Sequence, residues 1–155
     1  MKTRLLVSPF LMIPFLVRAN PVMIDGQSLI AFGIVAFWAL VVESGIATLV
    51  LTSSGVLTLP LFGALLMANV AVFLFAFLPL TARVSLFFLE PAVVLADAIL
   101  IKLLVSAPFL QAGDYIGVTW LRALTASSLG NIASYFIGEL ASHSPWIVHE
   151  NEGLG

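Results

Sequence analysis

The chain has 155 residues, of which 61% are hydrophobic and only 9% charged, and its formal net charge is −2. A soluble domain usually carries about 25% charged residues, so the composition excludes a water-exposed globule and predicts an integral membrane protein. The few Lys and Arg residues form no cluster that could neutralise phosphates, which argues against a nucleic-acid partner. With no cysteine, the chain has no disulfide and no thiolate metal site.

The first 19 residues have the order of a secretory signal peptide. Lys2 and Arg4 precede an apolar run from Leu5 to Val17, and Ala19 suits a cleavage site. The run is too short to span a bilayer, which takes about 20 residues. The alternative is a short N-terminal anchor segment that is retained.

Four further apolar segments are long enough to cross a bilayer. They extend over residues 29–51, 56–80, 86–105 and 116–140. Gly, Pro or small polar residues fill the breaks between them, as is typical of turns. The sequence therefore predicts an all-α protein, with a four-helix transmembrane bundle over residues 20–141 and a polar C-terminal tail over residues 142–155. Glu90 precedes a proline at the start of the third segment, where an acid suits the positive end of a helix.

The membrane orientation depends mainly on the signal-like start. If the basic N-terminus stays inside, four spans place the C-terminus outside, and Lys102 and Arg122 flank the inner loop. Arg18 and Arg83 then lie outside, so the positive-inside rule hardly discriminates between the two orientations. We expect a bacterial inner membrane as the location.

The segments form two helical hairpins, residues 29–80 and 86–140, that resemble each other. In each hairpin an acid lies inside the first span and an asparagine inside the second. These four residues are Glu43, Asn69, Asp97 and Asn131. The shared placement predicts an internal duplication, with copies related by an axis along the membrane normal. Chance similarity between apolar segments is the alternative.

The four polar residues are the candidate intramembrane cluster. Polar groups are costly in hydrocarbon, so each acid is expected to approach the asparagine of its own hairpin. One interpretation is structural: the acid–amide hydrogen bond fixes the hairpin, although such bonds average only about 0.6 kcal/mol in membranes. The other is a polar pathway for protons, ions or a small solute. The structural interpretation is favoured at this point.

Small residues recur at every fourth position of the last span. The residues of this small-residue stripe are Ala126, Gly130, Ser134 and Gly138. Small side chains let two membrane helices approach closely, so the stripe predicts a helix contact. The second span carries an equivalent row at Ala64, Ala68, Val72 and Ala76.

Catalytic and cofactor-binding patterns are missing. His143 and His149 are the only histidines, and no histidine lies inside a span, so neither haem ligation nor a metal site is supported. No enzyme activity and no cofactor are expected. The sequence therefore favours a small, non-catalytic accessory or scaffolding subunit, whose partners are the lipid bilayer and other membrane protein subunits. A small proton, ion or solute transporter that uses Glu43 and Asp97 is the alternative.

Overall fold

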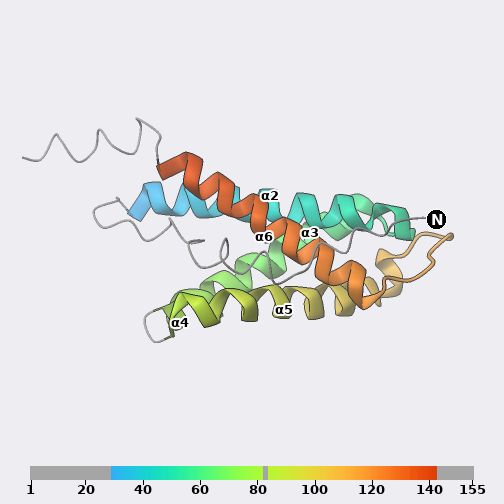
Figure 1. The fold of residues 1–155 in the computed structure, drawn as a ribbon. Coiled ribbons are helices and arrows are strands. Elements are labelled where there is room, and N and C mark those ends of the chain that lie inside the picture. Colours follow the sequence, from blue (N-terminus) through green and yellow to red (C-terminus); the bar gives the residue numbers. More distant parts are fainter. Residues whose placement is uncertain (1–28, 82–83, 143–155) are drawn as a thin grey trace, which may run out of the picture.

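The computed structural model describes residues 29–81 and 84–142. This part of the chain is helical and contains no strand (Figure 1). The long elements are α2 (Leu29–Leu51), α3 (Thr58–Val72), α5 (Leu86–Val105) and α6 (Trp120–Ser142), with the π-helical turn η3 (Phe73–Phe77) and the short α4 (Leu78–Thr81) continuing α3. The signal-like segment of residues 1–19 and the tail from residue 143 onward lie outside the described residues.

Successive helices run in opposite directions, so α2 is parallel to α5 and α3 is parallel to α6 (Figure 1). The two halves thus run in the same sense, as a tandem duplication requires; the duplication itself stays a prediction. Two of the helical segments, Phe32–Ser54 and Thr58–Leu80, are long and apolar enough to cross a membrane.

Most helix boundaries agree with those expected from the sequence, and α6 is the exception. The sequence predicted a start near residue 116, whereas α6 begins at Trp120. Gly117 adopts a left-handed conformation, with φ of 86°, which a helix cannot include. Thr119 then caps the helix: its side-chain oxygen accepts a hydrogen bond from the Arg122 amide at 3.2 Å.

The hydrophobic core lies at one end of the bundle, where the α2–α3 and α5–α6 connections meet. It includes Leu51, Leu61, Leu65, Ala98, Ile101, Val105, Leu110, Ala123 and Ala126. The two connections pair through backbone hydrogen bonds, from the Leu57 amide to Leu110 at 2.8 Å and from the Ala112 amide to Gly55 at 2.8 Å. We call this the loop end of the bundle.

Two cations bind carbonyl groups at the loop end. The Arg122 guanidinium donates to the Val50 carbonyl at 3.1 and 3.2 Å, and also to the Ser53 hydroxyl. The Lys102 ammonium donates to the Val118 carbonyl at 2.6 Å and lies 5.6 Å from the centre of the Trp120 ring. Cations near the last carbonyl groups of a helix are favourable, and here they also join neighbouring segments.

The closest helix packing occurs between α2 and α6, which share the most extensive contact in the bundle. Gly130 makes it possible: a Cβ atom at this position would lie 2.9 Å from the Glu43 carbonyl oxygen and 3.1 Å from its Cγ. Ala126, one turn away, is completely buried. This half of the small-residue stripe therefore lies at a tight helix contact.

We expect Gly130→Ala to destabilise the bundle by about 1–3 kcal/mol, because the new methyl group must displace the α2 backbone. Gly63→Ala is the matched control: it lies in α3 with open space around it, so better helix propensity should leave stability unchanged or slightly raised. Denaturant titration in micelles measures both. Equal stability of the two variants would show that Gly130 is not at a tight contact.

Candidate functional site

The first acid–asparagine pair joins α2 to α3. The Asn69 side-chain amide donates to Glu43 Oε1 at 3.3 Å and to Ser44 Oγ at 3.2 Å. Glu43 is 8% exposed, Ser44 is fully buried and Asn69 is 6% exposed. The first hairpin thus has its acid bound to its own amide inside the bundle.

The second pair joins α5 to α6 in the same way. The Asn131 amide donates to Asp97 Oδ2 at 3.0 Å and to the Ser127 carbonyl at 3.0 Å. The Ser127 hydroxyl in turn donates to the Val94 carbonyl of α5 at 2.8 Å. Asp97 is 5% exposed, so this carboxyl group also lies in the interior.

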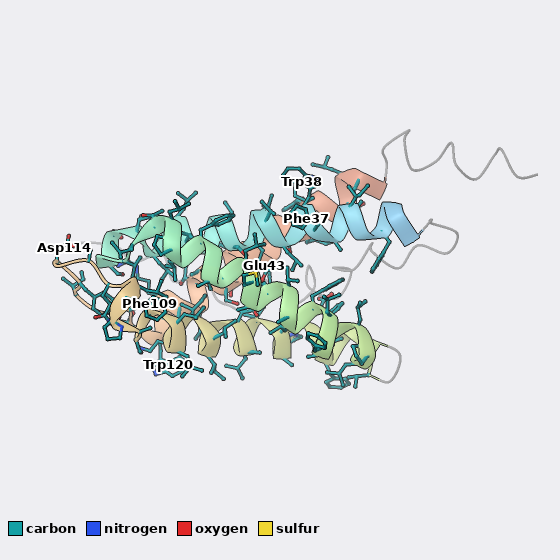
Figure 2. All side chains as sticks on the ribbon, turned by 180° about the vertical axis from the view of Figure 1, so that it is seen from behind. Phe37, Trp38, Glu43, Phe109, Asp114 and Trp120 are labelled. Atoms are coloured by element: carbon teal, nitrogen blue, oxygen red, sulfur yellow. The ribbon has the colours of Figure 1, made fainter. Side chains whose placement is uncertain are left out.

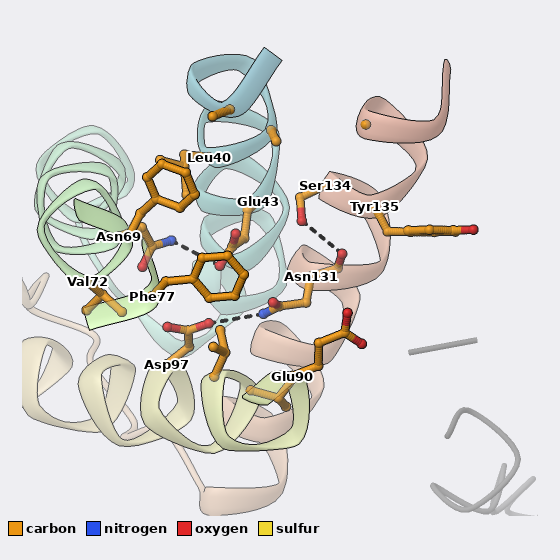
Figure 3. Close-up of a pocket in the computed structure, with 16 residues that line it drawn as sticks. Leu40, Glu43, Asn69, Val72, Phe77, Glu90, Asp97, Asn131, Ser134 and Tyr135 are labelled. Atoms are coloured by element: carbon orange, nitrogen blue, oxygen red, sulfur yellow. Dashed lines mark hydrogen bonds between the residues drawn. The ribbon is translucent and has the colours of Figure 1, made fainter. Parts of the chain in front are cut away.

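The two pairs meet at the centre of the bundle. The carboxyl groups of Glu43 and Asp97 lie close to each other, and Figure 3 shows them between Asn69 and Asn131. We call these four residues the polar floor. The acid–acid contact was not foreseen from the sequence, although each acid lies eight residues before the end of its helix, at Leu51 and Val105.

A cavity of about 110 Å³ lies directly beside the polar floor, on the side away from the loop end (Figure 3). All four long helical segments contribute to its lining. The core residues of α2 and α5 follow Glu43 and Asp97 in the chain, and those of α3 and α6 precede Asn69 and Asn131. The polar floor therefore separates the packed apolar core from the cavity.

Glu90 is a third acid in the cavity wall, and its role was missed in the sequence. The sequence placed it at the first turn of its helix, but α5 begins at Leu86, as expected, so Glu90 is its fifth residue and lies beyond the first turn, with Pro91 inside the helix. Glu90 is only 8% exposed, and neither of its carboxylate oxygens has a hydrogen-bond partner among the described residues. Its position, two helical turns before Asp97 and on the same face, is the signal that could have found it.

Two stacked phenylalanines form an aromatic wall of the cavity. The rings of Phe73 and Phe77 have centres 5.7 Å apart and planes 17° apart, and both line the cavity. They are the first and last residues of the π-helical turn η3. Single π-turns inside α-helices occur frequently at functional sites, so this interruption of α3 is consistent with a site here.

The small-residue stripe of α6 is divided between packing and cavity. Ala126 and Gly130 lie on the loop-end side and at the floor, whereas Ser134 and Gly138 line the cavity. The equivalent row proposed for the second span does not form the buried face of α3. That face consists of Leu61, Leu65 and Asn69, because α3 packs through larger side chains.

A double-mutant cycle tests the contact between the hairpins. We expect Glu43→Met and Asp97→Leu to be coupled by about 0.5–3 kcal/mol, because each single change leaves the other carboxyl without its partner. Denaturant titration in micelles gives the four free energies of unfolding. As a control, Glu43→Met and Asp114→Asn, at the exposed loop end, should be additive. Additivity of Glu43→Met with Asp97→Leu would contradict the contact.

Comparison with known proteins gives no family for this chain: no protein-family model, curated protein or solved structure matches it. Its function is therefore inferred from the arrangement of its own residues.

Proposed function

We propose that all four long helical segments cross the membrane as an antiparallel bundle. Large apolar side chains project from the outside of every segment (Figure 2). The most exposed include Trp38, Leu49, Leu59, Phe75, Leu103, Leu121 and Leu140. The helices α5 and α6 have 20 and 23 residues, which is enough for the roughly 30 Å of hydrocarbon. An apolar surface on all sides suits lipid better than water.

The charges of α5 and α6 are compatible with this arrangement. Glu90 and Asp97 are buried inside the bundle. Lys102 and Arg122 lie at the loop end, where they bind backbone carbonyls. Glu139, the fifth charged residue of these two helices, lies in the last turn of α6, three residues before its end at Ser142. A charged residue in a membrane helix is tolerated when it faces the interior or lies close to a membrane interface, and these five do so.

Within this bundle, we propose a pathway for protons or a small cationic solute, with Glu43 and Asp97 at its centre. The observation that carries the proposal is the unpartnered, buried Glu90 in the cavity above the carboxyl pair. A purely structural acid–amide bond explains Glu43, Asp97 and their asparagines, but it requires neither a cavity nor a third acid. Because of this cavity and its third acid, we favour transport over the accessory role that the sequence indicated.

The accessory or scaffolding role, without catalysis, is the second candidate. It is favoured by the fact that each acid binds the amide of its own hairpin, as a structural lock requires. In that case the exposed apolar faces would contact other membrane subunits. Purification from native membranes separates the two candidates, because a subunit should be recovered with a stoichiometric partner and a transporter should not.

The proposed location is a bacterial inner membrane with the C-terminus outside. Lys102 and Arg122 at the loop end are balanced by Arg18 and Arg83, so the orientation depends on the basic, signal-like N-terminus, which favours the loop end on the cytoplasmic side. The cavity then lies on the outer side of the polar floor, and the apolar core closes the inner side. This arrangement corresponds to an outward-facing half-channel.

The transport proposal is tested with Glu43→Gln and Asp97→Asn combined. The amides keep the shape and hydrogen bonds of the floor but remove its titration, so we expect proton or cation flux into reconstituted vesicles to fall to the level of protein-free vesicles. Asp114→Asn, which removes a carboxyl at the exposed loop end, should keep wild-type flux. Unchanged flux in the double variant, with its fold intact, would support the structural role instead.

A further inference from the structure

We propose that the cavity binds a small protonated amine, whose ammonium group lies between Glu90 and Phe77 and whose alkyl group packs along the aromatic wall. This inference rests on the proposed pathway and names the class of solute that it admits. The carboxylate of Glu90 supplies the charge, the cavity supplies the size limit, and Phe73 and Phe77 supply an apolar and cation-attracting surface.

The charge of the cavity selects a cation. Glu43, Glu90 and Asp97 all line it, whereas none of the described residues that line it is a Lys, Arg or His. The floor carboxyls already accept hydrogen bonds from Asn69 and Asn131. Glu90 has no hydrogen-bond partner among the described residues, even though it is buried, with only 8% of its surface exposed. Leaving a buried acceptor unsatisfied is costly, so the missing donor is expected to come from a ligand.

The spacing of the acids favours an organic cation over a metal ion. Glu90 lies about 10 Å above Asp97 along the α5 axis, at 1.5 Å per residue. Metal ions need several ligand atoms within about 2.6 Å. Among the described residues, no three metal-binding side chains are close enough to hold such an ion.

The aromatic wall lies at the height where the cation is needed. The helices α3 and α5 run in opposite directions (Figure 1). Phe77 follows Asn69 by eight residues and Glu90 precedes Asp97 by seven, so both lie at about the same distance from the polar floor, on its cavity side. A cation over the face of an aromatic ring gains roughly 0.5–1 kcal/mol, and more where water is excluded. Glu90 and Phe77 can therefore bind one ammonium group from two sides.

The size of the cavity limits the alkyl group. Its volume of about 110 Å³ is below the ~150 Å³ of an engineered apolar cavity that binds benzene. A short alkylammonium ion fits this space. Propylammonium is a suitable probe, and neutral 1-propanol has nearly the same shape without the charge.

Isothermal titration of the purified full-length protein in micelles tests the proposal at neutral pH. We expect propylammonium to bind, and 1-propanol and potassium chloride to give no saturable binding. Glu90→Gln should weaken the affinity for propylammonium at least about tenfold, because it removes a charge-assisted hydrogen bond. Asp114→Asn removes the same charge at the loop end and should leave the affinity unchanged.

A second pair of variants keeps the test valid if Glu90→Gln does not fold. Phe77→Leu should weaken binding roughly threefold to thirtyfold. Phe75→Leu, in the same π-helical turn but 82% exposed and outside the cavity, should have no effect. Equal binding of 1-propanol, no binding of propylammonium, or equal effects of Phe77→Leu and Phe75→Leu would overturn the inference.

Vesicle flux distinguishes this inference from the pathway on which it rests. Proton flux in the absence of propylammonium binding would leave the pathway standing and overturn the amine site. Saturable propylammonium binding with no flux of either species would support the amine site and overturn the pathway.

Discussion

The close approach of the Glu43 and Asp97 carboxyl groups constrains the rest of this bundle. Both carboxyls lie on helices otherwise rich in apolar residues, and neither can face lipid without a large cost. Bringing them together fixes the rotation and depth of α2 and α5 relative to each other. Asn69 and Asn131 then fix α3 and α6, because each donates to the acid of its own hairpin. One central contact thus connects the two hairpins.

The polar floor also divides the bundle into two parts with different packing. Toward the loop end, leucine, isoleucine and alanine side chains fill the interior, and the paired connections close it. Away from the loop end, the helices enclose a cavity with Glu90 and the stacked phenylalanines in its wall. Gly130 lies at the boundary, where α6 touches the backbone of Glu43. A solute that enters the cavity would therefore meet the carboxyl pair before any apolar barrier.

The sequence predicted the bounds of α2 and α5 and an all-helical architecture, because apolar runs interrupted by Gly and small polar residues mark membrane helices directly. It also predicted Glu43 and Asp97 as candidate site residues, since acids are rare inside apolar segments. The acid–acid contact, the position of Glu90 and the π-helical turn at Phe73 were not predicted. These features depend on how four helices rotate against one another, and the near-uniform hydrophobicity of each helix gives little signal for that rotation.

If the polar floor separates a water-accessible cavity from a dry core, cysteines on its two sides should differ in their accessibility to water-soluble reagents. The chain contains no cysteine, so single cysteines can be introduced without background. Ser134→Cys and Val93→Cys line the cavity, whereas Ala126→Cys and Ala98→Cys lie in the fully buried core. We expect a charged, water-soluble thiol reagent to modify the first two in membrane vesicles and neither of the last two. Equal modification of all four positions, or protection of all four, would contradict it.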